Sequence, residues 1–89
     1  MDLWSALVQA SEPVNAAALT ALGQRIRMRR KSLGWTQEDL ADRAMLDRSY
    51  MGGIERGERN ITFNILCQIS AALRCDVASL TQGIPELRK

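Results

Sequence analysis

Residues 36–60 constrain the fold of this chain most strongly, because they contain signals for two short helices with a corner of three residues between them. Thr36 followed by Asp39 is close to a capping box, in which the threonine hydroxyl accepts a backbone N–H and the acid lies in the first turn. Asp47 is placed to cap a further helix that begins at Arg48. This stretch is therefore predicted to form two short helices joined by a tight turn.

The two predicted helices differ in their apolar faces. In the first helix, the apolar positions include two alanines, which allow another helix to approach closely: Leu40, Ala41 and Ala44. In the second, Met51 and Ile54 point inward by their spacing, with Tyr50 as a further candidate. The residues left to face outward are Arg48, Ser49, Gly52, Gly53 and Arg56.

The chain before this stretch carries two helix signals. Four apolar residues near the start share one face of a short helix and can pack on their own domain or across a dimer: Leu3, Trp4, Leu7 and Val8. Ser11 and Pro13 then predict a new helix start, and Gly34 predicts its end. Gly23 leaves open whether this is one helix or two, since an interior glycine costs only about 1 kcal/mol.

After this stretch, Gly57 ends the second helix and two more helices are predicted. Thr62 caps the first, whose core positions are Ile65, Leu66, Ile69, Ala72 and Leu73. Asp76 caps a short last helix from Val77 to about Gln82, and residues 83–89 form a tail. This tail contains two apolar residues, Ile84 and Leu87. They either remain unpacked at the terminus or belong to a self-association surface.

The composition predicts one all-α domain. Eighty-nine residues with 46% hydrophobic content support a single modest core, and 4% aromatic content makes that core aliphatic. We therefore expect one compact helical domain.

Catalytic and metal chemistry are excluded by what the sequence lacks. The chain has no histidine, and Cys67 and Cys75 lie eight residues apart without a Cys-x-x-Cys spacing, so a zinc site lacks ligands. No cysteine is paired with an activating group and no phosphate-cradling glycine motif occurs. We expect no enzyme activity and no cofactor, reduced cysteines, and no signal peptide or membrane span.

The charge is unevenly placed, although the formal net charge is only +2. Five basic residues fall within seven positions that contain no acid: Arg25, Arg27, Arg29, Arg30 and Lys31. Such a cluster is either a solvated helix face or a surface for a polyanionic partner.

Three motifs resemble one family of regulators. They are L-G-x-x-I-R-x-x-R over 22–30, G-x-T-Q-E-x-L-A over 34–41 and L-D-R-S-Y-x-x-x-I-E-R-G-x-R-N over 46–60. Together they are similar to the phage-repressor-like (Cro and lambda-repressor type, or XRE) helix-turn-helix regulators, and most similar to the controller proteins of restriction-modification systems. The resemblance covers residues 22–80. It implies a compact five-helix, lambda-repressor-like domain over residues 22–82, preceded by a helical extension over residues 1–21. The second short helix would enter the DNA major groove.

The resemblance also implies roles for single residues. Arg48 and Ser49 would contact bases, with Arg48 reaching guanine O6 and N7. Phosphates would be contacted by Gln37, Tyr50, Arg56, Arg59 and Asn60. Gln37 would also brace the base-reading helix, and the Tyr50 ring would pack inward. Arg30 and Glu55 would form a buried ion pair that holds this helix.

The adjacent glycines depart from the family pattern. Gly52 and Gly53 stand where relatives often carry a side chain that reaches DNA, so more specificity is expected from DNA shape. Two glycines cost about 2 kcal/mol in a short helix. We expect the offset to come from close approach of DNA or, alternatively, from packing against the neighbouring helix.

The function implied is a sequence-specific regulator in the bacterial or phage-infected cytoplasm that binds a pseudo-palindromic DNA operator as a homodimer. The dimer would form through the last helix and the tail, at Val77, Leu80, Ile84 and Leu87. An alternative is the antitoxin of a toxin–antitoxin pair, with the Leu3, Trp4, Leu7 and Val8 face docking a second protein.

Overall fold

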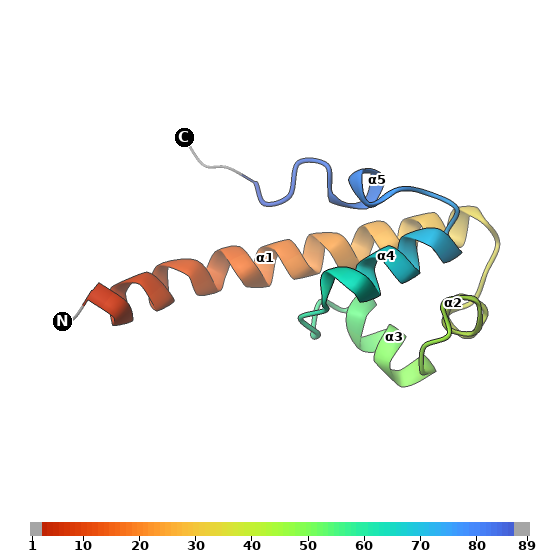
Figure 1. Ribbon diagram of the computed structural model, residues 1–89, viewed down its shortest axis with the longest axis horizontal. Coiled ribbons are helices and arrows are strands. Elements are labelled where there is room, and N and C mark those ends of the chain that lie inside the picture. Colours follow the sequence, from red (N-terminus) through yellow and green to blue (C-terminus); the bar gives the residue numbers. More distant parts are fainter. Residues whose placement is uncertain (1–2, 87–89) are drawn as a thin grey trace.

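Five helices follow one another along the chain (Figure 1). The computed structural model describes the backbone of residues 3–86 and the side chains of residues 16–86. The helices are α1 (Leu3–Ser32), α2 (Gln37–Ala44), α3 (Arg48–Glu55), α4 (Phe63–Ala72) and α5 (Val77–Thr81). Within the described backbone there is no β-strand, so the all-α prediction is confirmed.

The long helix α1 is the main correction to the sequence prediction. A break was expected near Ser11 and Pro13, but α1 is continuous over 30 residues, and Gly23 does not interrupt it. An interior proline removes one helical hydrogen bond and its ring clashes with the carbonyl four residues earlier, at a cost of about 3 kcal/mol, which is why a break was expected there. Gly34, with φ 76°, follows the end of α1 as predicted. The predicted apolar face of Leu3, Trp4, Leu7 and Val8 lies outside the described side chains.

The remaining helices begin at the predicted capping residues. Thr36, Asp47, Thr62 and Asp76 each accept a backbone N–H from the residue three positions later. Each cap satisfies one of the backbone donors that a helix start leaves without a partner. Local sequence therefore determines where α2 to α5 begin.

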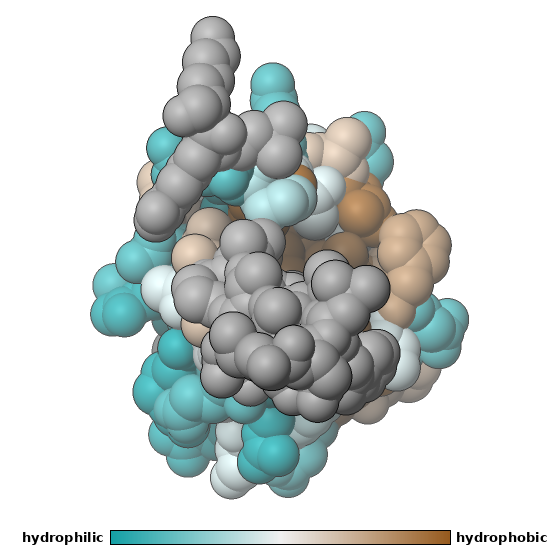
Figure 2. Space-filling model, turned by 90° about the vertical axis from the view of Figure 1, so that its left-hand side faces the viewer, coloured by the Kyte–Doolittle hydropathy of each residue, from teal (hydrophilic) through white to brown (hydrophobic). Residues whose placement is uncertain are grey.

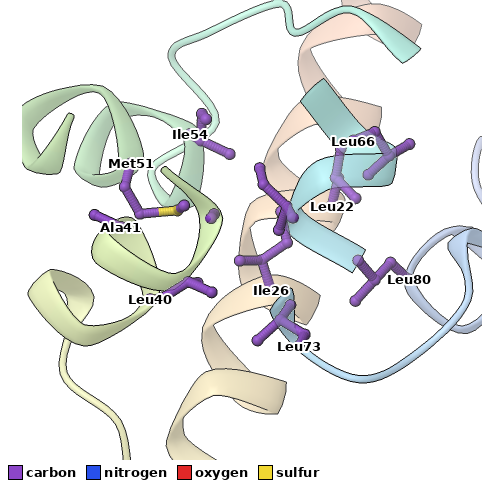
Figure 3. Packing of buried hydrophobic residues seen from close by; sticks show 11 residues of the cluster. Leu22, Ile26, Leu40, Ala41, Met51, Ile54, Leu66, Leu73 and Leu80 are labelled. Carbon is purple, nitrogen blue, oxygen red and sulfur yellow. The ribbon is translucent and has the colours of Figure 1, made fainter. Parts of the chain in front are cut away.

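The core lies where these helices meet the C-terminal half of α1 (Figure 3). Ile26 of α1 is fully buried among residues of every other helix, and the cluster is aliphatic as predicted: Leu22, Ile26, Leu40, Ala41, Ala44, Met51, Ile54, Leu66, Ile69, Leu73 and Leu80. In Figure 1, α3 lies on one side of α1 and α5 on the other. The core thus fixes α3 and α5 to opposite sides of one long helix.

The described surface is mixed in polarity. Figure 2, which views the end from which α1 projects, shows apolar colour gathered on one side and hydrophilic colour on the other. The large apolar side chains exposed within residues 16–86 are Met28, Met45 and Phe63. No helix in the described part of the chain has the length and apolarity needed to cross a membrane.

Candidate nucleic-acid interface

The corner between α2 and α3 orients the candidate DNA-contacting helix. Met45 has a left-handed conformation, with φ 56°, and its side chain is 82% exposed. The Leu46 N–H donates to the Ala41 carbonyl at 2.9 Å, which closes the end of α2. The Tyr50 N–H then donates to the Asp47 carboxylate at 3.1 Å, which starts α3. The predicted three-residue corner, residues 45–47, is confirmed.

A capping box fixes the start of α2. The Asp39 N–H donates to the Thr36 hydroxyl at 3.0 Å, and the Thr36 N–H donates back to the Asp39 carboxylate at 2.9 Å. The hydrogen bond from the Thr36 backbone, followed by that from its side chain, lowers the pKa of Asp39 below its ordinary value. The carboxylate is therefore ionised at neutral pH, as the positive end of the helix dipole favours.

The N-terminal end of α3 presents the two predicted base-contacting residues. Arg48 and Ser49 are both exposed, whereas Met51 and Ile54 further along the helix are buried. Tyr50 is half-buried and its ring packs against the core, as predicted. The first turn of α3 is thus free to enter a groove while its later turns anchor it.

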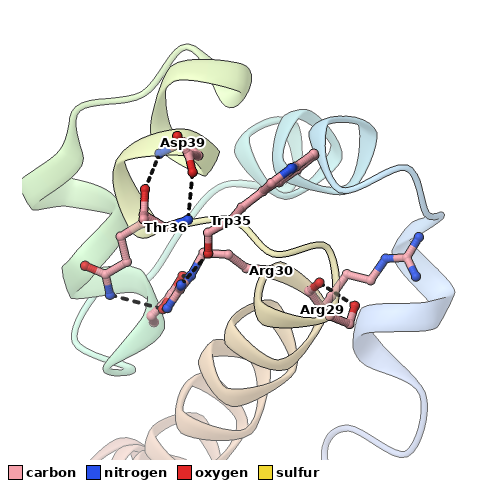
Figure 4. A network of polar contacts seen from close by, with 8 residues as sticks. Arg29, Arg30, Trp35, Thr36 and Asp39 are labelled. Carbon is pink, nitrogen blue, oxygen red and sulfur yellow. Dashed lines mark hydrogen bonds and ion pairs between the residues drawn. The ribbon is translucent and has the colours of Figure 1, made fainter.

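The C-terminal end of α3 is held by a buried ion pair (Figure 4). The Arg30 Nε donates to Glu55 Oε2 at 2.7 Å and the Arg30 Nη2 donates to Oε1 at 2.9 Å, so the pair is bidentate as predicted. The Arg30 Nη1 donates to the Trp35 carbonyl at 2.9 Å, and the Gln37 amide donates to Glu55 Oε1 at 3.1 Å. Four hydrogen bonds therefore join the Arg30 guanidinium and the Glu55 carboxylate to each other and to residues 35 and 37, and Gln37 contacts the end of α3 directly.

Gly23 is a site residue that the sequence prediction missed. A Cβ at this position would lie 2.4 Å from the Glu55 carbonyl oxygen and 2.6 Å from that of Ile54. At Gly57, with φ 77°, a Cβ would lie 2.8 Å from Thr20 Cα. The end of α3 therefore packs directly on the backbone of α1, a contact that only glycine permits. The interior glycine of α1 was the available signal, but it was considered only as a break.

The adjacent glycines of α3 are buried, because side chains cover the outward face on which they were predicted to lie. A Cβ on Gly52 would lie 3.1 Å from Arg56 Nη1 and 3.4 Å from Gln37 Oε1. A Cβ on Gly53 would lie 3.1 Å from Arg59 Cγ. The two arginine side chains fold back over the glycines and cover them, which supplies contacts that offset part of the glycine cost.

The predicted phosphate-contacting residues near the end of α3 differ in whether an acidic side chain pairs with them. Arg56 Nε lies 2.6 Å from Glu58 Oε2. This hydrogen bond raises the pKa of Arg56 and lowers the pKa of Glu58, so both stay charged and largely neutralise each other. Arg59 instead stacks over Tyr50, with its guanidinium carbon 5.8 Å from the ring centroid, and Asn60 is exposed. Arg59 is the stronger local positive charge.

The predicted dimer residues are not all on the surface. Leu80 is 2% exposed and belongs to the core of its own chain. Val77 and Ile84 are half-buried against that core, and Leu87 lies outside the described residues. The expected apolar surface is therefore smaller than the sequence suggested, because Leu80 is used internally.

The family model described as helix-turn-helix matches residues 26–80, which include the α2–corner–α3 unit. The chain belongs to this helix-turn-helix family, of the XRE type. The control protein C.SmaI of Serratia marcescens is 37% identical over 59 residues, which are 66% of this chain and 70% of that protein.

Solved structures of controller proteins share the helix-turn-helix fold. The restriction-modification controller C.AhdI from Aeromonas hydrophila has a TM-score of 0.68 and 42% identity, over 70% of this chain and 94% of that one. The controller C.Esp1396I, solved as a tetramer with its natural 35-base-pair operator, has a TM-score of 0.66 and 38% identity, over 71% and 83%. Other curated relatives are longer, and the aligned part of this chain spans about half of their length.

Proposed function

We propose that this chain is a sequence-specific double-stranded DNA-binding transcription regulator of the restriction-modification controller type. The observation that carries the proposal is the contrast within α3, where Arg48 and Ser49 are exposed at one end while Glu55 is buried and bound by Arg30 and Gln37 at the other. The controller C.Esp1396I, whose solved complex contains operator DNA, supports the same role.

In this proposal Arg48 and Ser49 read base edges, with Arg48 donating to guanine O6 and N7. Backbone phosphates are contacted by Gln37, Tyr50, Arg56, Arg59 and Asn60. Because arginine side chains cover Gly52 and Gly53, α3 offers few further side chains to bases. A larger part of the specificity is therefore assigned to DNA shape and deformability.

The regulator is proposed to act in the cytoplasm as a homodimer on a pseudo-palindromic operator. One recognition helix with two base-contacting residues discriminates weakly, and two-fold pairing multiplies that discrimination. Val77 and Ile84 would supply the exposed apolar part of the interface, supported from beneath by Leu80. The relatives reported above are regulators, so the antitoxin alternative with its second protein partner is not favoured, and no catalytic role is proposed.

Selection from a random duplex library, combined with sedimentation, tests this proposal. We expect enriched sequences with two related half-sites about 10 base pairs apart, and a dimer at micromolar concentration. Enrichment of a single half-site by a monomer would contradict the dimer. No enrichment above the random pool would contradict sequence-specific binding itself.

A further inference from the structure

A surface pocket of about 790 Å³ lies between α1, the end of α4 and α5. Its α5 wall lies on the opposite side of α1 from α3 (Figure 1), so the proposed DNA contacts leave the pocket uncovered. Its volume falls within the range of about 300–1,000 Å³ that is common for small-molecule sites. The proposed DNA contacts do not use this pocket, although Leu80 in its lining also supports the proposed dimer interface.

Three arginines line the pocket and one carboxylate faces them. Arg29 is fixed, because its Nε donates to the Leu73 carbonyl at 3.0 Å and its Nη2 to the Arg74 carbonyl at 3.2 Å. Figure 4 shows Arg29 pointing away from the ion pair made by its neighbour Arg30. Within the side chains of residues 16–86, the ion pairs are Arg30–Glu55 and Arg56–Glu58, so Arg25 and Arg74 have no carboxylate partner there. The Arg74 guanidinium carbon lies 5.9 Å from the centroid of the Trp35 ring.

The remaining polar groups do not neutralise these arginines. The Asp76 carboxylate caps α5 and accepts from the Ser79 N–H at 2.9 Å and from the Ser79 hydroxyl at 2.6 Å through one oxygen. Burial raises the pKa of the Cys75 thiol, which therefore stays protonated and uncharged at neutral pH. The pocket therefore keeps an excess of positive charge, which can make charge-assisted hydrogen bonds to an anion.

Apolar atoms complete the lining beside the arginines. Met28 and Ala71 are exposed at the rim, and Leu80 lies at the base. The exposed Met28 side chain, at 71%, is flexible and adapts to different apolar shapes. A ligand that matches this lining carries an oxyanion on an apolar body.

We propose that this pocket binds a small organic anion, with its carboxylate or phosphate held by Arg25 and Arg74 and its apolar part on Met28, Ala71 and Leu80. Such a ligand would bridge α1 and α5, and so hold the α5 region relative to the DNA-binding helices. The site is open to solvent, which leaves part of the ligand exposed and makes its affinity modest.

Amide NMR titration of the whole chain with phenyl phosphate and with octanoate tests the proposal. We expect saturable shifts over residues 74–80, with a Kd of about 1 mM or tighter for one of the two probes. Inorganic phosphate alone is expected to bind at least about tenfold more weakly, because it makes no apolar contact. The two organic probes distinguish a phosphate ligand from a carboxylate ligand.

Charge-matched variants show whether the pocket itself is responsible. The double variant Arg25→Gln with Arg74→Gln should weaken binding at least about tenfold, and the single variant Arg25→Gln repeats the test with less perturbation. The control Arg27→Gln with Lys31→Gln removes two exposed charges that do not line the pocket, and should change Kd by no more than about twofold.

Three outcomes would overturn the site. They are no saturable shift with either organic probe, equal weakening in the pocket and control variants, and altered sedimentation of the pocket variant without ligand shifts. The last outcome would assign the surface to contact between copies of the chain. The NMR titration involves neither DNA nor dimerisation, so a failed titration is distinguishable from failure of the proposed regulatory function.

Discussion

The two ends of α3 are built in opposite ways. At the N-terminal end, Arg48 and Ser49 are exposed. The helix starts there with a local hydrogen bond from the Tyr50 N–H to the Asp47 carboxylate. At the C-terminal end, Glu55 is buried, bound by Arg30 and Gln37, and packed on the backbone of Gly23. The side chains at the N-terminal end can therefore contact DNA without disturbing the fold, whereas those at the C-terminal end fix the position of the helix.

This division reduces the cost of binding. A side chain that reads a base must be placed accurately, and accuracy comes from neighbours that are already ordered. The buried pair and the glycine contact order α3 in the free protein. The exposed residues then lose only their own rotamer freedom when they meet DNA.

The largest expected effect is at the buried end, for Glu55→Ala. Removing this carboxylate leaves Arg30 buried without its partner, which should lower the free energy of unfolding by about 3–5 kcal/mol. Denaturant unfolding measures the loss. Glu58→Ala is the matched control, because its ion pair with Arg56 is also short but more than half exposed and should contribute little. Equal losses from the two variants would contradict the structural role of Glu55.

Gly23→Ala should have the next largest effect. In a helix this substitution alone would stabilise by about 1 kcal/mol, but the new Cβ meets the Glu55 and Ile54 carbonyls. We expect a net loss of about 1–3 kcal/mol in thermal or denaturant unfolding, together with weaker DNA binding because α3 must shift. Gln24→Ala, at the exposed neighbouring position, should be close to neutral. A stabilised Gly23→Ala protein would show that the contact is not tight.

Met45→Gly addresses the corner that leads into the exposed end. Met45 has φ 56° and is 82% exposed, so glycine relieves backbone strain and loses little buried area. We expect a gain of about 0.5–1 kcal/mol in the free energy of unfolding. Asp42→Gly, within α2, should have the opposite sign, because helical backbone disfavours glycine. Destabilisation of both variants would contradict the left-handed corner.

The smallest effect is expected for Arg59→Ala. Its charge is not paired as that of Arg56 is, so its loss should weaken binding to all duplexes similarly. The slope of log K against log salt should fall by about one unit. Arg27→Ala, an exposed arginine on α1, should leave the slope unchanged. A specific change at one base position would instead assign Arg59 to base reading.

Sequence predicted the parts of this fold that depend on local chemistry. Each helix cap involves a side chain and a backbone N–H only three residues later, so a few residues of sequence are enough to predict it. These caps are Thr36, Asp47, Thr62 and Asp76. The Arg30–Glu55 pair came from family resemblance, because no local rule joins residues 25 positions apart.

The errors have tertiary causes. The cost of Gly23 in an isolated helix is small and indicates nothing about the α3 carbonyls that pack on it. Gly52 and Gly53 lie on the outward face by spacing, but Arg56 and Arg59 return from later in the chain to cover them. Leu80 was predicted at the dimer interface, and the structure places it in the core of its own chain, where a small domain needs its apolar residues.

Binding of Arg48→Ala to the selected operator and to random duplexes shows whether the exposed end of α3 reads bases. If the exposed end of α3 reads bases, affinity for the operator should fall by about 1–3 kcal/mol and preference should relax at one base position. Affinity for random duplexes should change much less, and the free energy of unfolding should stay the same, since Arg48 is exposed. An unchanged ratio of operator to random affinity would contradict direct readout by this end of the helix.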